Sequence, residues 1–241
     1  MAVELSPEQE WTLVACGMVA HADDELEFGE WDQILRVVDA NVDDEGVGPW
    51  IELLSDRPAL ERRFAELPPP MPFVAEEILE RSWRIALADG AGSEVEAEVH
   101  DRVAERVGVK VEEAARLRAT WTTEASERAE LVVAFAAALA NLDGRMDSAE
   151  AAQFDSLLER MPVSVARRLE LSALLYNPPK LDELGLRLGK LSESLREGVL
   201  HELAPLVNAT HQSEREQGVY LELARQAAIP EHRARKILEA T

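Results

Sequence analysis

Aspartate and glutamate recur together at one fixed spacing, and this is the feature of the sequence most suited to chemistry. In each copy an apolar run ends at an aspartate, and a glutamate follows seven residues later, where a new helical pattern opens. The complete pairs are Asp23 and Glu30, Asp89 and Glu96, and Asp143 and Glu150. Carboxylates converging from two such turns would bind a hard divalent cation, Ca²⁺ or Mg²⁺ rather than Zn²⁺. These six residues are the predicted metal ligands.

A fourth copy of this acidic frame is eroded. Thr210 stands at its aspartate position and Gln217 at its glutamate position. If two opposed turns of one half form a joint site, the first half keeps that site and the second half has lost it. Three further acids around the first turn, Asp24, Glu25 and Glu27, strengthen the prediction there.

The same turns also have a purely structural interpretation. Gly90 and Gly144 follow the helical runs and can take the left-handed conformation that ends a helix. Ser93 and Glu96 have the spacing of a capping box, which satisfies free N–H groups at a helix start and contributes on the order of 1 kcal/mol. In this alternative the turns only cap helices, and the chain is a structural adaptor or co-chaperone-like module.

His100 could extend a metal site. It lies four residues after Glu96, and therefore on the same face of a helix. The corresponding residues of the other copies are Ile34, Phe154 and Leu221. Because all three are apolar, the pattern favours a core histidine over a ligand.

No arrangement of nucleophile and base indicates an enzyme. Cys16 lies within an apolar run, where a buried thiol is expected. The sequence has no Ser–His or Cys–His pairing, no phosphate loop, no E-x-x-H pair of a di-iron bundle and no complete EF-hand loop. We therefore predict a non-enzymatic protein without an organic cofactor, and a metal-dependent hydrolase is the least favoured alternative.

The segments around the turns are predicted to be helices. Helical spacing of apolar residues marks helices at 7–22, 31–38, 73–88, 93–107, 111–120, 123–142, 148–160, 192–208 and 213–228. Prolines open further helices at residues 49, 58, 162 and 230, and another helix follows residues 177–179. The proline run of residues 67–72 is interpreted as a stiff loop within a domain. No segment shows strand alternation, so the predicted fold is all-α.

Landmarks of the first half recur in the second. Asp23 and Asp143 are 120 residues apart, as are Pro58 and Pro178. This constant offset predicts two homologous domains of about seven helices each. We place them at residues 1–121, with both acidic turns, and 122–241, with one eroded turn. The connector of residues 119–126 has no glycine or proline, so the two bundles are expected to pack together.

The acidic frame resembles the TerB-like family, which is named for bacterial tellurite resistance. The resemblance is carried by A-x-x-A-D-G-x-x-x-x-x-E, which leaves an apolar helix and recurs about 66 residues later, and it covers almost the whole chain as two copies. It implies a compact helical bundle with internal pseudo-symmetry for each copy. It also implies that the six acids named above bind metal. The chain departs from the pattern at Asp24, which replaces glycine, and in the fourth copy.

Charge and composition limit the partners. The net charge of −22 would repel phosphate backbones, so we expect no nucleic-acid binding. Residues 1–121 hold 28 acidic and 11 basic residues, and residues 122–241 hold 19 and 14. We therefore expect a partner protein with a basic surface, attracted chiefly by the first half, and make no prediction of oligomeric state.

The expected location is the cytoplasm, without direct membrane insertion. No apolar run reaches the roughly 18 residues of a membrane span, and the N-terminus lacks the regions of a secretory signal. The function expected from these features is a TerB-like stress-response or interaction protein. It would bind a partner protein, with a divalent cation as the candidate ligand of the turns.

Overall fold

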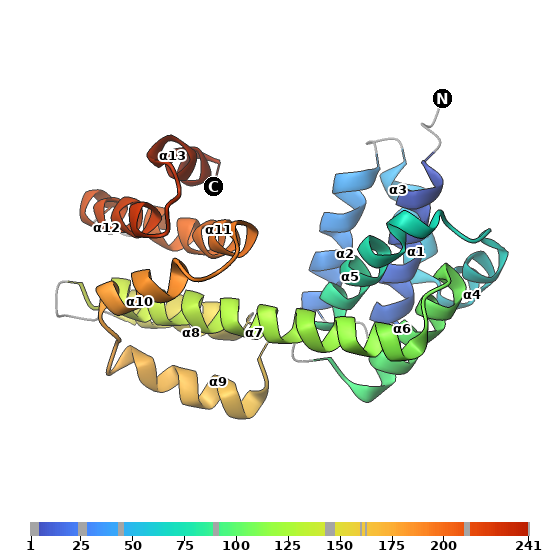
Figure 1. Cartoon of the computed structure of the whole chain (residues 1–241), viewed down its shortest axis with the longest axis horizontal. Helices are drawn as coiled ribbons and strands as arrows, with labels where there is room; N and C mark the ends of the chain where they lie inside the picture. The colour runs from blue at the N-terminus through green and yellow to red at the C-terminus, as the bar shows by residue number, and fades with distance from the viewer. Residues whose placement is uncertain are drawn as a thin grey trace. The chain divides into compact units, whose positions relative to one another are not determined.

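The computed structural model of the chain is helical (Figure 1). It describes residues 5–23, 28–42, 46–88, 92–142, 148–159, 161, 163–209 and 213–240. None of these residues lies in a β-strand, which confirms the predicted all-α fold for this part of the chain. The contacts within the chain divide it into two compact units, residues 1–123 and 124–241.

The first unit is organised around one buried helix. Its elements are α1 (Pro7–Ala20), α2 (Phe28–Asn41), α3 (Val47–Ser55), α4 (Arg57–Glu66), the short 3-10 helix η1 (Pro72–Val74), α5 (Ala75–Ala86), α6 (Glu94–Val107) and the first part of α7 (Val111–Ala140). Every residue of α1 from Trp11 to Ala20 is buried. The helix packs against α2, α4, α5 and α6, as expected for a helix that is apolar on all sides.

α1 begins where the sequence predicts. Ser6 is its N-cap, and Pro7 occupies the first helical position. The backbone N–H of Gln9 donates to the Ser6 hydroxyl at 3.2 Å, and the Ser6 N–H donates to the Gln9 side-chain oxygen at 2.9 Å. This capping box satisfies N–H groups that have no partner within the helix.

α7 corrects the prediction of two separate helices over 111–120 and 123–142. It is one continuous helix of 30 residues, and the boundary between the two units falls inside it. The reason is that residues 119–126 contain neither glycine nor proline, so nothing in the backbone ends the helix there. Within the described ranges, no helix has the length and apolar character needed to cross a membrane.

The elements of the second unit resemble those of the first, except that the 3-10 helix follows the third α-helix of the second unit and the fourth α-helix of the first. The second unit consists of the last part of α7, α8 (Ser148–Glu159), α9 (Val165–Ser172), the 3-10 helix η2 (Ala173–Leu175), α10 (Leu181–Leu188), α11 (Glu193–Ala209), α12 (Ser213–Gln226) and α13 (Glu231–Glu239). All residues of α7 from Leu131 to Leu139 are buried, so this part of α7 takes the place that α1 has in the first unit.

Structural details of the first unit recur 120 residues later. The N–H of Val109 closes the end of α6 by donating to the carbonyl five residues earlier, and the N–H of Ile229 does the same for α12, each at 2.8 Å. Both ends contain a residue with positive φ, Gly108 at 85° and Ala228 at 56°. The starts of α2 and α8 are also 120 residues apart. This spacing supports the hypothesis of two homologous halves.

Candidate functional site

Two of the six predicted metal ligands have side chains that the structure describes. Asp23 is exposed just after α1, and Glu96 is buried in the first turn of α6. Asp89 and Asp143 lie outside the described residues, as do the side chains of two acids placed in helices, Glu30 in α2 and Glu150 in α8. Among the side chains that are described, no group of three or more histidines, cysteines or acids could hold a metal ion. The predicted site therefore stays a prediction.

Glu96 forms the capping box that the sequence predicts. The Ser93 N–H donates to one carboxylate oxygen of Glu96 at 2.5 Å, and the Glu96 N–H donates to the Ser93 hydroxyl at 3.1 Å. Only 6% of the Glu96 surface is exposed. The capping box that the sequence predicts at the start of α6 is thus confirmed.

The 120-residue spacing corrects the fourth copy of the acidic frame. Counted from Glu96 it leads to Glu216, and not to the neighbouring Gln217. Glu216 is buried like Glu96, with 4% of its surface exposed. This burial favours Glu216 over Gln217 as the counterpart of Glu96. The aspartate position, counted in the same way from Asp89, holds Ala209.

Glu216 lines a small recess of about 30 Å³ in the second unit, which is large enough for one water or ion. The recess is formed by Ala136, Leu139, Ala140, Gln153, Phe154, Leu206 and Glu216. The residues 120 positions earlier are Cys16, Val19, Ala20, Gln33, Ile34, Ala86 and Glu96. The glutamine and the glutamate, which are the two polar members, are identical in the two units, whereas four of the five apolar members differ.

His100 is a core residue, as the sequence favoured. It is fully buried on α6, and its Nε2 lies 2.9 Å from the Leu79 carbonyl oxygen. Its Nδ1 lies 3.0 Å from the Arg118 guanidinium, which also contacts Asp101 at 2.5 Å. Because the guanidinium can only donate, Nδ1 accepts and Nε2–H donates to the carbonyl. Both ring nitrogens are therefore engaged, and neither is available as a metal ligand.

Aromatic rings and a cation complete this buried cluster around His100. The Trp83 ring lies edge-to-face with the imidazole at 5.4 Å between centroids, and the Trp121 ring at 6.4 Å. The Arg118 guanidinium lies 5.5 Å from the centre of the Trp83 ring. Burial, with a smaller effect from the positive charge of Arg118, lowers the pKa of His100 to about 4. The fold therefore holds this histidine in its neutral form.

We predict that His100 makes the first unit less stable in mild acid. The unfolded chain takes up a proton on this histidine below a pKa of about 6.5, whereas the folded chain does not until about 4. Stability is therefore complete above pH 6.5 and falls as the pH is lowered towards 4, by about 1 kcal/mol between pH 7.5 and 5.5. Urea unfolding at the two pH values should show this extra loss in the wild type and not in His100→Gln. The exposed His232 is the control, and His232→Gln should keep the extra loss of stability at pH 5.5. If His232→Gln removed that loss as His100→Gln does, the prediction would be contradicted.

A larger polar recess of about 170 Å³ lies in the first unit. It is lined by Glu8, Gln9, Thr12, Asn41, Val74, Glu77, Ile78 and Arg81. The Gln9 amide donates to the Asn41 carbonyl at 3.2 Å, and Arg81 pairs with Glu77 at 2.7 Å. These residues are up to 73 positions apart in the chain, so no local sequence pattern indicates the recess. It has room for several waters or a small polar molecule.

The one cysteine takes no part in either recess that the structure shows. Cys16 is buried in α1, and burial raises its pKa to about 12. A thiol with so high a pKa is not ionised near neutral pH and is a poor nucleophile. The prediction of a buried, structural cysteine is confirmed.

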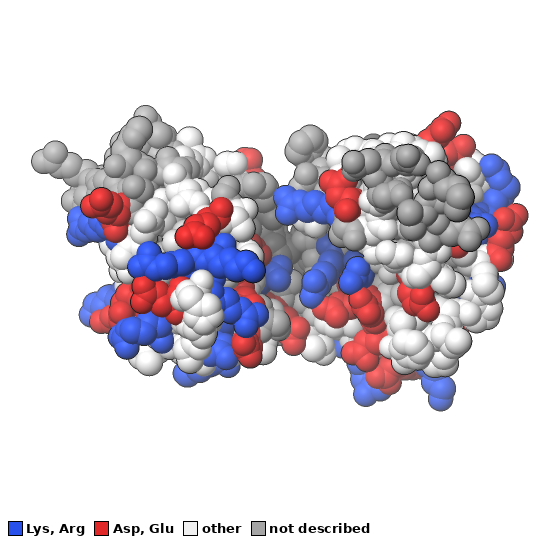
Figure 2. All heavy atoms as spheres, turned by 90° about the horizontal axis from the view of Figure 1, so that it is seen from above, with Lys and Arg blue, Asp and Glu red and all other residues white. Residues whose placement is uncertain are grey.

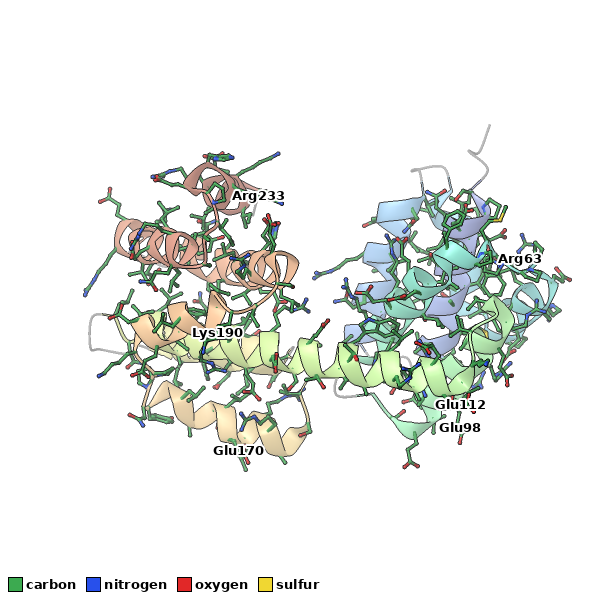
Figure 3. All side chains as sticks on the ribbon, viewed as in Figure 1. Arg63, Glu98, Glu112, Glu170, Lys190 and Arg233 are labelled. Atoms are coloured by element: carbon green, nitrogen blue, oxygen red, sulfur yellow. The ribbon has the colours of Figure 1, made fainter. Side chains whose placement is uncertain are left out.

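Charged side chains of both signs lie close together on the described surface. Figure 2 shows Lys and Arg beside Asp and Glu on the face it presents. Figure 3 shows the labelled Glu98, Glu112 and Glu170 directed away from the helices that carry them. Exposed ion pairs of this kind contribute about 0 to 1 kcal/mol each, so they decide little of the fold. Their charges act mainly on solubility and on the approach of partners.

Comparisons with family models, with curated proteins and with solved structures found no match to this chain. The TerB-like resemblance thus continues to rest on the acidic frame alone.

Proposed function

We propose that this protein is a non-enzymatic, TerB-like interaction protein. In this proposal a divalent cation, Ca²⁺ or Mg²⁺, binds at the acidic helix corners of the first unit, through Asp23, Glu30, Asp89 and Glu96. The acidic first unit attracts a basic surface of a partner protein. The chemistry needed is binding only, for which carboxylate oxygens suffice.

The observation that carries the proposal is the recurrence of an aspartate and a glutamate seven positions apart at helix corners, which is complete at both corners of the first unit and at only one corner of the second. Capping alone does not require a carboxylate, because Gln9 makes the same bond at the start of α1. A carboxylate, unlike an amide, also carries the negative charge that Ca²⁺ and Mg²⁺ favour in their oxygen ligands.

A second candidate function is a purely structural adaptor, in which the turns only cap helices. It is favoured by the complete capping box of Ser93 and Glu96, in which the Ser93 N–H donates to a carboxylate oxygen of Glu96 and the Glu96 N–H donates to the Ser93 hydroxyl. The helix dipole also favours an acid in the first turn, by about 0.3 to 1 kcal/mol. The two candidates differ in whether a cation changes stability.

The test is the thermal midpoint of the full chain with Ca²⁺, Mg²⁺, Zn²⁺ or chelator. A cation at a hundredfold excess over its Kd increases the free energy of unfolding by about 2.7 kcal/mol. This increment should raise the thermal midpoint. Glu96→Gln should remove this increment and keep the cap, since an amide oxygen can still accept from the Ser93 N–H. Ser93→Ala should cost about 1 kcal/mol and leave most of the increment.

Glu216→Gln is the matched control in the second unit, where Ala209 takes the place of an acid, and it should leave the increment intact. A wild-type midpoint that no cation moves would exclude the cation and leave the adaptor.

The partner's basic surface can be probed with poly-L-lysine. Association should weaken with salt, because ions at about 0.15 M screen charges beyond roughly 8 Å. Neutralising Asp23, Asp24, Glu25 and Glu27 should slow it more than neutralising four exposed acids of the second unit. Those four are Asp182, Glu183, Glu214 and Glu239. Equal effects would show that the charge difference between the units has no role.

A further inference from the structure

The segment of residues 67–73, Leu-Pro-Pro-Pro-Met-Pro-Phe, joins α4 to η1 and is called the proline segment here. From Leu67 to Met71, every residue is a proline or directly precedes one. Proline fixes φ near −65° and drives the residue before it out of the helical region. Leu67 accordingly has φ −60° and ψ 129°, and Met71 has φ −65° and ψ 137°. Both are close to the polyproline II helix.

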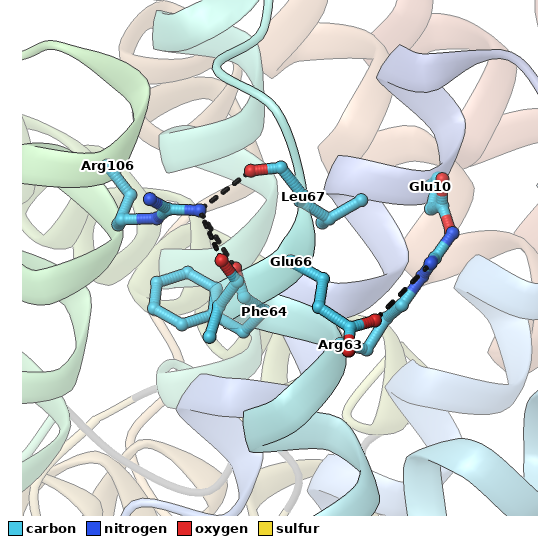
Figure 4. Close-up of polar contacts among 7 residues, drawn as sticks. Glu10, Arg63, Phe64, Glu66, Leu67 and Arg106 are labelled. Atoms are coloured by element: carbon cyan, nitrogen blue, oxygen red, sulfur yellow. Dashed lines mark hydrogen bonds and ion pairs between the residues drawn. The ribbon is translucent and has the colours of Figure 1, made fainter.

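Side chains of the first unit hold the beginning of the proline segment in place. Arg106 donates to the Leu67 carbonyl at 2.7 Å and also to the last carbonyls of α4, as Figure 4 shows. The indole N–H of the buried Trp11 donates to the Pro68 carbonyl at 2.7 Å. The Leu67 side chain is itself part of the core, with 4% exposed. These anchors act on backbone oxygens, so they leave the proline rings free.

The rest of the segment is presented to solvent. Pro68, Pro69 and Pro72 are exposed. Met71 is 60% exposed and Phe73 is 82% exposed, which makes Phe73 the most exposed of the large hydrophobic side chains described in this unit. Large apolar side chains that are contiguous on a surface often mark an interaction site.

The second unit shows that the fold does not need this segment. The residues 120 positions later join α10 to α11 by Gly189, Lys190, Leu191 and Ser192, with no proline. There, the N–H groups of Lys190 and Leu191 each donate to a carbonyl three residues earlier at 3.1 Å, and Leu191 packs on the core. Met71, the counterpart of Leu191, is turned out to solvent instead. The first unit thus has an apolar, proline-rich connection at a place where the second unit joins its helices by a short turn without proline.

We propose that the proline segment is a docking site for a partner domain with an aromatic-lined groove that binds polyproline II helices. Such a helix has three residues per turn, so Pro69 and Pro72 lie along one edge and can enter neighbouring pockets of a groove. From Leu67 to Pro72, where η1 begins, an extended chain of this kind spans about 15 Å at 3.1 Å per residue. Because it is already extended and anchored, little conformational entropy is lost on binding. This proposal is independent of the cation site, which involves other residues.

Charges beside the segment specify the groove further. Glu66 precedes it, and Glu76 and Glu77 follow it on α5, all three with exposed side chains. Glu66 pairs with Arg63 and Glu77 pairs with Arg81, so Glu76 is the acid on which a basic residue at the edge of the groove would act.

The proposal is tested by titrating the full chain with a panel of purified SH3 and WW domains that bind proline-rich peptides, including members with basic flanks. At least one domain should bind with a Kd below about 1 mM. Pro69→Ala, Pro72→Ala and Phe73→Ser should each weaken that binding by about tenfold or more. Far-UV circular dichroism should show that the variants stay folded, since the anchoring carbonyls belong to the backbone.

Leu186→Ser is the matched control, because Leu186 is 72% exposed on α10 and lies outside the segment. It should leave the binding unchanged. Failure of every panel member to bind, or equal losses on Leu186→Ser, would overturn the proposal. So would a concentration-dependent dimer that Phe73→Ser dissociates, because the segment would then be covered by a second copy of the chain.

Discussion

Arg118→Ala should destabilise the first unit by about 3 kcal/mol. The Arg118 side chain is only 11% exposed, and it pairs with Asp101, donates to His100 and lies over the Trp83 ring. Its removal leaves a partly buried carboxylate and a buried ring nitrogen without their charged donor. Breaking a buried pair from one side costs more than the pair contributes, because the remaining partner stays desolvated.

Urea unfolding followed by tryptophan emission measures this loss in the right unit, since all five tryptophans lie within residues 11–121. Arg116→Ala is the matched control on the same helix. Arg116 is 73% exposed and pairs with the exposed Glu113, so its loss should cost less than about 0.5 kcal/mol. Similar losses in the two variants would show that the buried cluster contributes no more than a surface pair.

Gly92→Ala should also cost about 3 kcal/mol. Gly92 has φ +79°, and a Cβ placed on it would lie 2.4 Å from an atom of the Trp83 ring. The left-handed conformation costs about 1 to 2 kcal/mol for alanine, and forcing a packed side chain aside costs about 1 to 3 kcal/mol more. Trp83 cannot easily give way, because its ring packs against His100 and its N–H donates to Thr122 at 2.9 Å.

Gly108→Ala separates the two contributions. Gly108 has φ +85° but open space around its missing Cβ, so only the backbone cost of about 1 kcal/mol is expected. An alanine is tolerated in this conformation in the second unit, where Ala228 occupies the matching position at φ 56°. Urea unfolding of both variants should give a difference of about 2 kcal/mol. If Gly92→Ala and Gly108→Ala lost equal stability, the Trp83 ring would have moved aside at no cost in free energy.

The predictions that hold best from sequence are those that depend on a few neighbouring residues. The capping boxes of α1 and α6 each involve residues three positions apart, and the box of Ser93 and Glu96 forms as the sequence predicts. The predicted helices 93–107, 148–160 and 192–208 are observed as α6, α8 and α11, each within one residue at either end. Caps and apolar periodicity act within a turn or two, so the local sequence is sufficient to determine them.

Sequence-based predictions are least secure where a shift of one residue changes which side chain is buried, and where the end of a helix depends on a signal that is absent. The break expected near residues 119–126 does not occur, because a helix continues unless a glycine, a proline or a cap ends it. The register of the fourth acidic frame depends on one residue, and the burial of Glu216 favours it over Gln217 as the glutamate position. Composition does not show this, because Glu216 and Gln217 are neighbours and both are polar.

The tertiary structure alone decides which distant groups meet. Trp11 binds the carbonyl of Pro68 across 57 positions of the chain, and His100 lies between the Leu79 carbonyl and the Arg118 guanidinium. The sequence identified His100 as a core residue but not its partners. Apolar spacing specifies which face of a helix is buried, whereas the angle and rotation at which two helices pack determine the polar groups that come within hydrogen-bonding distance.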